Sequence, residues 1–115
     1  MQRGEVRLTD LEPVRGSEAS KRRPAVIVSN DRANMTADRL GRGVVTVVPV
    51  TSNVERVFPF QTLLTAEATG LRMDSKAQAE QVRSVAVERL GPILGRVPAQ
   101  VMAQLDDALR LHLAL

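Results

Sequence analysis

The segment from Val44 to Thr51 restricts the fold of this chain more than any other part of its sequence. Five of the eight residues are valine, and β-branched side chains favour the extended conformation of a strand. Pro49 lies inside the run. Because proline has no N–H to give to a sheet ladder, it marks an edge, a bulge or the end of regular pairing. We therefore predict a strand over Val44–Thr51, with Ser52 and Asn53 emerging at the rim of a sheet.

Shorter segments with strand character lie on both sides of this run. Val6 and Leu8 alternate with polar residues, which predicts a half-buried first strand. Ala25–Ser29 is β-branched and follows a proline, which predicts a buried strand. Further strands are expected at Val57–Leu64, Ala77–Ala86 (which also suits a helix) and Gly91–Val97. The polar segments Asp10–Arg23 and Asn30–Gly43 are predicted to be loops, the second with room for one helical turn.

The C-terminal segment has helical periodicity instead. Pro98 suits the first turn of a helix, and apolar residues then recur on one face: Val101, Met102, Leu105, Ala108, Leu109 and Leu113. Short strands followed by one helix indicate a mainly β (α+β) fold, a small barrel or curled antiparallel sheet with the helix packed against it. We expect one domain over residues 1–115, with the sheet over about residues 1–97 and the helix over about 98–114.

Composition excludes several kinds of site. The chain has no cysteine and one histidine, His112, so a zinc site lacks ligands and disulfides cannot form. There is no glycine-rich phosphate loop, and we expect neither a metal nor a cofactor. The N-terminus does not read as a signal peptide, and the longest apolar run is too short to cross a bilayer. These features predict a soluble, cytoplasmic protein without a membrane partner.

Charge favours a local positive surface. Sixteen Lys and Arg oppose thirteen Asp and Glu, for a net charge of +3, and the densest basic cluster is Lys21-Arg22-Arg23. Such a cluster is either a solvated loop or an attraction for phosphate. With two phenylalanines and no tryptophan or tyrosine, an aromatic base-stacking platform of the usual kind is not expected.

Three polar side chains are predicted to meet at the sheet rim. Arg23 leads one buried strand and Thr51 ends another, and neighbouring antiparallel strands bring such ends together. Glu18 lies in the loop before Arg23. A guanidinium, a hydroxyl and a carboxylate suit a phosphate diester, because arginine makes bidentate contacts and stabilises developing charge. From the residues alone, the alternative is that Arg23 snorkels and Thr51 caps a turn.

The order of short motifs resembles the MazF/PemK toxin family over nearly the whole chain. The motifs are Arg3-Gly4-Glu5-Val6, Asp10-Leu11-Glu12-Pro13, Gly16-Ser17-Glu18, Arg23-Pro24-Ala25-Val26, Val48-Pro49-Val50-Thr51-Ser52, Pro59-Phe60 and Gln81-Val82-Arg83-Ser84. Each motif is short, and their common order and spacing make the match specific. Arg7 departs from the family, in which many members carry an aromatic residue at this position.

The resemblance implies a CcdB/PemK-like fold, an SH3-like curled barrel with a C-terminal helix, assembled as a homodimer. It implies a sequence-selective endoribonuclease that cuts single-stranded RNA without a metal. The RNA 2′-hydroxyl would be the nucleophile, leaving a 2′,3′-cyclic phosphate (or 3′-phosphate) and a 5′-hydroxyl. A cognate antitoxin would hold the toxin inactive, and DNA would be met only through that antitoxin. The rival is a non-enzymatic toxin of the same fold that inhibits a protein such as DNA gyrase.

The resemblance also implies roles for single residues. Arg23 and Thr51 match catalytic positions, and Glu18 matches an acidic one. The expected substrate contacts are Ser17, Lys21, Arg22, Ser52, Asn53, Glu80 and Gln81. Because an arginine stays protonated at neutral pH, we assign Arg23 to stabilising the phosphate and Thr51 to orienting it. The general base would be Glu18, Glu80 or the substrate itself.

Overall fold

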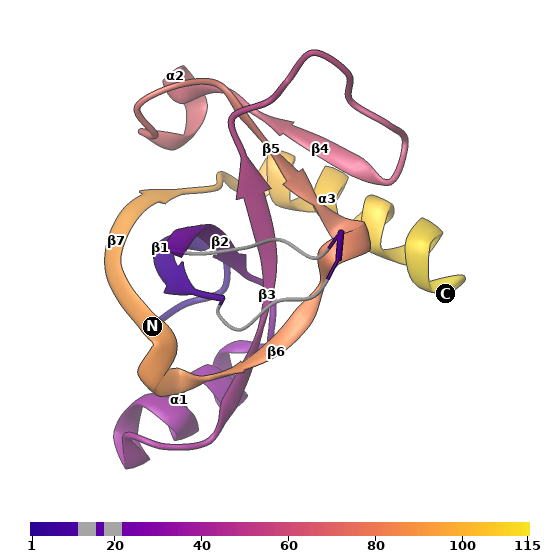
Figure 1. Cartoon of the computed structure of the whole chain (residues 1–115). Coiled ribbons are helices and arrows are strands. Elements are labelled where there is room, and N and C mark those ends of the chain that lie inside the picture. The colour runs from indigo at the N-terminus through magenta and orange to yellow at the C-terminus, as the bar shows by residue number, and fades with distance from the viewer. Residues whose placement is uncertain (12–15, 18–21) are drawn as a thin grey trace.

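The chain forms a strongly curled antiparallel sheet with a long helix at its C-terminus (Figure 1). The computed structural model describes residues 1–11, 16–17 and 22–115. The strands are β1 (Glu5–Asp10), β2 (Arg22–Ile27), β3 (Val44–Thr51), β4 (Gln61–Leu64), β5 (Ser75–Gln78), β6 (Arg83–Ala86) and β7 (Leu90–Arg96). The helices are α1 (Asp31–Leu40), α2 (Ala66–Thr69) and α3 (Ala99–Leu113), with 3-10 turns η1 (Ala79–Gln81) and η2 (Val87–Arg89).

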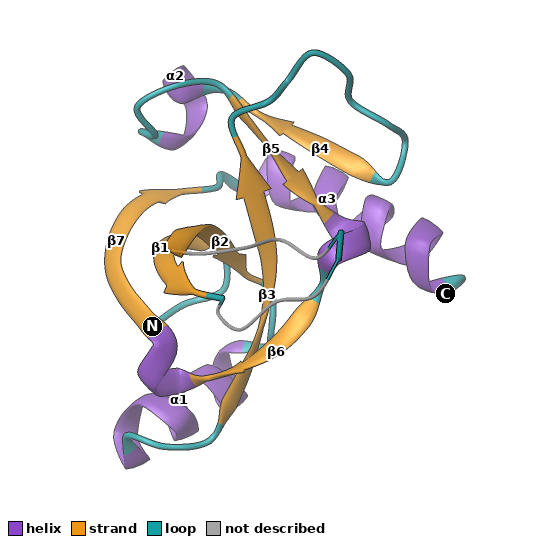
Figure 2. Ribbon diagram, viewed as in Figure 1, coloured by secondary structure: helices purple, strands orange, loops and turns teal. Residues whose placement is uncertain are grey.

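β3 is the centre of the sheet. The strand order is β4-β5-β3-β2-β1-β7, and β6 pairs with the first half of β3 while β5 pairs with its end. Pro49 falls between the last residue paired with β6, Val47, and the first paired with β5, Val50. The missing N–H therefore lies where β3 changes partners, as its position in the sequence predicts. The sheet stays open: β4 and β7 lie at the two ends of the strand order, and β6, which pairs with β3 alone, forms a further edge (Figure 2).

The central strands are buried on both faces, and the two faces pack against different helices. Val26, Val48 and Val50 belong to a cluster with Met102, Leu105 and Ala108 of α3. The alternate residues of the same strands form a second cluster with Ala37 of α1: Ala25, Ile27, Val45 and Val47. Side chains alternate along a strand, so every residue of β2 and β3 is assigned to the α3 face or to the α1 face.

The prediction of a loop over Asn30–Gly43 is wrong, because α1 occupies ten of these residues. The Asn30 side chain accepts a hydrogen bond from the Ala33 N–H at 2.9 Å, and Gly41 closes the helix with φ 65°. Asn34, fully buried, ties the helix to the sheet by donating from Nδ2 to the Ser29 carbonyl at 2.9 Å. The Asn30 cap and the buried Asn34 therefore stabilise and position α1, a role that an apolar stripe has in most helices.

Three other predictions need correction. The segment Ala77–Ala86 is two strands, β5 and β6, separated by η1, and the strand expected from Val57 begins only at Gln61. β2 begins at Arg22 and ends at Ile27, earlier than predicted at both ends. The strand Val44–Thr51 and the terminal helix are confirmed, although Leu113 is 49% exposed. No helix in the described part of the chain is long and apolar enough to cross a membrane.

Candidate active site

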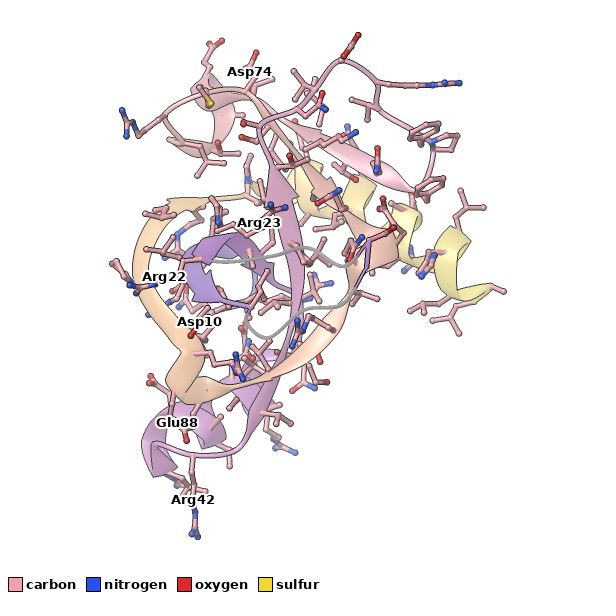
Figure 3. All side chains as sticks on the ribbon, viewed as in Figure 1. Asp10, Arg22, Arg23, Arg42, Asp74 and Glu88 are labelled. Carbon is pink, nitrogen blue, oxygen red and sulfur yellow. The ribbon has the colours of Figure 1, made fainter. Side chains whose placement is uncertain are left out.

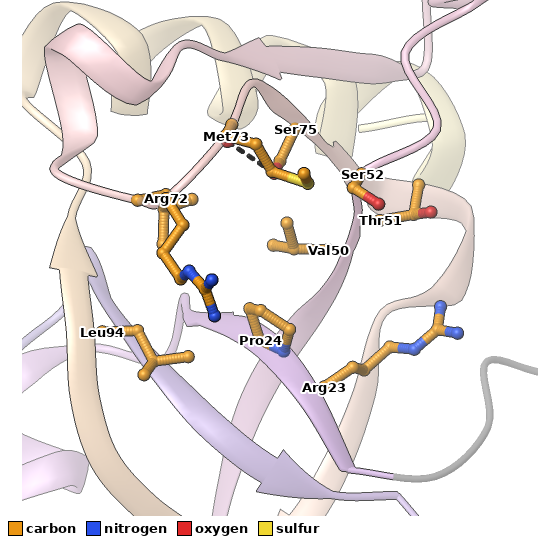
Figure 4. A pocket seen from close by; sticks show the side chains of 10 residues that line it. Arg23, Pro24, Val50, Thr51, Ser52, Arg72, Met73, Ser75 and Leu94 are labelled. Atoms are coloured by element: carbon orange, nitrogen blue, oxygen red, sulfur yellow. Dashed lines mark hydrogen bonds between the residues drawn. The ribbon is translucent and has the colours of Figure 1, made fainter.

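Strand register sets Arg23 opposite Thr51. β2 and β3 pair with Ala25 opposite Pro49 and Ile27 opposite Val47. The same register, continued for two residues, brings Arg23 across from Thr51, and directly opposed residues point to the same face. Figure 4 shows the Arg23 guanidinium extending toward Thr51 from the neighbouring strand. The predicted meeting of these two side chains at the sheet rim is therefore present in the fold.

A pocket of about 580 Å³ opens beside this pair. Its lining residues are Arg23, Pro24, Val50, Thr51, Ser52, Leu71, Arg72, Met73, Ser75 and Leu94. In Figure 4, Arg23 and Thr51 lie on one side of the pocket, and Arg72 and Leu94 lie on the other. Since Val50 belongs to the α3 face, alternation places its neighbour Thr51 on the α1 face. Arg23 and Thr51 therefore border the pocket and point toward the α1 face.

Thr51 also shapes the turn that follows it. Its Oγ1 accepts a hydrogen bond from the Asn53 N–H at 3.3 Å, and the Asn53 Oδ1 accepts one from the Glu55 N–H at 3.2 Å. A hydroxyl has two lone pairs and one proton, so Thr51 caps this turn and can still donate. The capping role and a catalytic role, weighed as alternatives from the sequence, are compatible in one side chain.

Glu80 and Gln81 of η1 do not line this pocket. The Glu80 Oε2 accepts a hydrogen bond from Gln61 Nε2 at 2.7 Å, and Glu80 Oε1 is buried without a hydrogen-bond partner in the described residues. Gln81 Nε2 donates to the Ser17 carbonyl at 3.1 Å. Gln81 therefore holds the backbone of the Gly16-Ser17 turn, while the Glu80 carboxylate is engaged with β4.

A family model for the PemK-like, MazF-like toxin of type II toxin-antitoxin systems matches residues 2–113. The chain belongs to this toxin family. The toxin is 66% identical over 115 residues to Endoribonuclease MazF9 of Mycobacterium tuberculosis, across 100% of this chain and 98% of that protein. The predicted family is confirmed, and the relative bears the predicted enzyme class in its name.

Solved structures confirm the predicted CcdB/PemK-like fold of the toxin. MazF from Deinococcus radiodurans superposes with a TM-score of 0.83 at 27% identity, covering 100% of this chain and 97% of that chain. An endoribonuclease in complex with its cognate antitoxin, from a mycobacterial species, superposes with a TM-score of 0.77 at 23% identity, covering 100% and 96%. The second comparison shows the shared fold alone.

The remaining predicted site residues of the toxin are dispersed. Arg22 is exposed and precedes Arg23 on β2, so alternation turns it to the opposite face. Its register partner is Asp10 of β1, and Figure 3 shows Arg22 turned away from Arg23. Ser52 lines the pocket on the α3 face, whereas Asn53 lines a different pocket. Glu18 and Lys21 lie outside the described residues.

Several residues near the site were missed by sequence reasoning. Arg72 and Met73 reach the pocket from the loop before β5, and Ser75 reaches it from the first position of β5. The polar residues ahead of Lys76 indicate an exposed loop, but the place of this loop beside the pocket depends on α2, and the sequence pattern did not predict α2. In the described part of the toxin, no group of three or more His, Cys, Asp or Glu side chains is placed to hold a metal ion.

Proposed function

We propose that this toxin is an endoribonuclease that cuts single-stranded RNA, with Arg23 and Thr51 as its catalytic pair. The observation that carries the proposal is that both residues line one open pocket, where the β2–β3 register, continued for two residues, puts a guanidinium opposite a hydroxyl. The 66% identical relative named Endoribonuclease MazF9 supports the activity. In this proposal the reacting group is a phosphodiester, because its oxygens can accept hydrogen bonds from both the Arg23 guanidinium and the Thr51 hydroxyl.

In this mechanism the RNA 2′-hydroxyl attacks the adjacent phosphorus, and the bond to the 5′-oxygen of the next nucleotide breaks. The 2′-hydroxyl gives its proton to a general base (Glu18, Glu80 or the substrate itself), and the leaving 5′-oxygen takes up a proton. The products are a 2′,3′-cyclic phosphate and a 5′-hydroxyl, and a water molecule that opens the cyclic phosphate would give the 3′-phosphate. Arg23 donates to the non-bridging oxygens, where negative charge accumulates in the transition state. The Thr51 hydroxyl, which keeps its proton for donation, orients the phosphate. Because the nucleophile belongs to the substrate, the reaction needs no metal-bound water.

Cleavage of a synthetic single-stranded RNA in EDTA tests the proposal. We expect discrete cuts with 5′-hydroxyl ends, and a loss of about 10²–10³-fold in rate for Arg23→Lys and for Thr51→Val. Arg42→Lys is the matched control, because Arg42 is exposed and lies beyond α1, far from the site (Figure 3). Retention of RNA without cutting would make the toxin an RNA-binding module, and no interaction with RNA at all would favour the rival, a toxin directed at a protein such as DNA gyrase.

The proposal includes the partners that the resemblance implies. The pocket exposes apolar side chains, with Met73 57% and Leu94 37% accessible, which supports a second protein surface in this region. We assign that surface to a homodimer, in which two copies would form one RNA groove, and expect light scattering to give the mass of a dimer. A cognate antitoxin would lay an acidic segment across the basic rim, and DNA association would occur only through the antitoxin.

A further inference from the structure

A second pocket lies on the same face of the sheet as the catalytic pair. It has a volume of about 460 Å³ and is lined by Asn53, Glu55, Arg56, Phe58 and Lys76. Lys76 of β5 is the register partner of Thr51, and opposed side chains point to one face. Arg23, Thr51 and Lys76 therefore form a row across β2, β3 and β5, spanning about 10 Å at the usual strand spacing. The pocket lies at the Lys76 end of this row.

Lys76 carries a buried positive charge. The residue is 7% exposed, and its Nζ donates to the Arg56 carbonyl at 2.5 Å. Nζ also lies 5.9 Å from the centroid of the Phe58 ring. Lys76 forms no ion pair with any residue that the structure describes. An ammonium group has three hydrogen-bond donors, so two donors of Lys76 remain for a ligand. Burial of a charged ammonium group without an anion costs free energy, and a ligand that accepts from these two donors would offset that cost.

Flat groups form one wall of this pocket. The Phe58 and Phe60 rings stack with centroids 5.3 Å apart and an interplanar angle of 3°. The Arg56 guanidinium carbon lies 4.6 Å from the centroid of Phe58. RNA-binding proteins stack unpaired bases on aromatic rings and on arginine guanidinium planes. Phe58 and Arg56 line the pocket, and Phe60 stacks on Phe58 from outside the lining, so the Phe58–Arg56 wall gives a base a planar surface.

The carboxylate of Glu55 indicates that this pocket binds a nucleobase of the RNA and not a phosphate group. It lines the same pocket as Lys76, yet the two side chains form no ion pair with each other among the described contacts. A carboxylate repels a phosphate, but it accepts a hydrogen bond from a ring N–H. Guanine and uracil are the RNA bases that present a ring N–H beside a carbonyl oxygen. Lys76 as the donor and Glu55 as the acceptor, both lining this pocket, match the carbonyl oxygen and the ring N–H on that edge of guanine or uracil.

We propose that this pocket, lined by Glu55, Phe58 and Lys76, binds a guanine or uracil base of the substrate RNA next to the cut and sets the sequence preference there. Lys76 donates to the carbonyl oxygen of the base, Glu55 accepts from its ring N–H, and the Phe58–Arg56 wall packs on its plane. The inference rests on the proposed RNA cleavage. It adds the site and the chemistry by which one base is read.

Cleavage of a pool of single-stranded RNAs with randomised sequence, followed by sequencing of the 5′ ends of the products, tests this proposal. We expect the unaltered toxin to enrich guanine or uracil at one position beside the cut. Lys76→Met removes the donors at nearly constant length, and Glu55→Gln removes the carboxylate of an exposed residue. Each should lower the enrichment at that single position by about tenfold, while preferences at other positions persist. Arg42→Met, which removes a positive charge far from the pocket, should leave every position unchanged.

The outcomes separate the two proposals. If the toxin cuts RNA but both variants keep its base preference, the pocket does not read a base and this inference fails alone. If Lys76→Met slows cutting of all sequences equally and flattens the salt dependence, Lys76 contacts a phosphate and the inference is again wrong. If the unaltered toxin cuts no RNA, the proposed function fails and this inference with it. Should Lys76→Met not fold, Glu55→Gln alone decides between these results.

Discussion

Gln61 joins two parts of the fold through one buried amide, and its replacement by leucine gives a sharp test of the structure. The residue is 8% exposed. Its Oε1 accepts from the Phe58 N–H at 3.1 Å, and its Nε2 donates to Glu80 Oε2 at 2.7 Å. Leucine fills a similar volume but makes neither bond. A neutral hydrogen bond contributes about 1 kcal/mol and one to a charged group about 1.5–3 kcal/mol, so the expected loss in unfolding free energy is about 2.5–4 kcal/mol.

Urea and thermal unfolding followed by far-ultraviolet circular dichroism measure this loss, since the chain has no tryptophan or tyrosine for fluorescence. For a domain of this size the expected drop in Tm is about 10–16 °C. Gln104→Leu is the control, because Gln104 is exposed on α3, and it should change the unfolding free energy by less than about 0.5 kcal/mol. Equal effects of the two substitutions would show that the Gln61 amide does not hold Phe58 and η1 together.

Three further substitutions test other parts of the fold by the same unfolding measurement. Asn34→Leu removes the amide that binds Ser29 through both Oδ1 and Nδ2 and should cost about 2–3 kcal/mol; a neutral result would mean that α1 is not held by this residue. Gly95→Ala would place a Cβ 2.6 Å from the Thr69 carbonyl oxygen and should cost about 1–3 kcal/mol, unless β7 moves away from α2 without cost. Leu105→Ala empties a fully buried position under α3 and should cost about 2–5 kcal/mol; a smaller loss than for exposed Leu111→Ala would contradict the packing of this helix.

The parts of the fold that the sequence predicts well are those that bury apolar side chains at a regular spacing. Val44–Thr51 is a strand over the predicted residues, and α3 buries Met102, Leu105 and Ala108 as its periodicity requires. The helix α1 was missed because it buries only Asn34 and Ala37, so it has no apolar stripe to detect. Its Asn30 cap and its Gly41 terminus were visible signals, and they are the ones to weigh in a polar segment.

The sequence predicts only the part of the candidate site that follows from the pairing of two strands recognisable by their apolar residues. Arg23 and Thr51 were paired because they lead and end neighbouring antiparallel strands, and the register agrees. The same alternation rule turns Arg22 to the other face, so the sequence places Arg23 beside Thr51 but not Arg22. Lys76 could not be placed in this way. Its position opposite Thr51 depends on β5 pairing with the end of β3, a long-range contact without a local signal.

The position of Glu80 indicates that it is not the general base, which leaves Glu18 or the substrate as candidates. Its Oε2 is held by Gln61, and the residue lines neither the pocket beside Arg23 and Thr51 nor the second pocket. A base must approach within hydrogen-bond reach of the 2′-hydroxyl, so we expect Glu80→Gln to keep the rate of RNA cleavage within a few-fold. Glutamine retains an acceptor for Gln61 Nε2, and the unfolding free energy should fall by about 1 kcal/mol as a charged hydrogen bond becomes neutral. A loss of about 10²-fold or more in cleavage with an unchanged unfolding midpoint would instead make Glu80 the base, and η1 would then have to approach the catalytic pair when RNA binds.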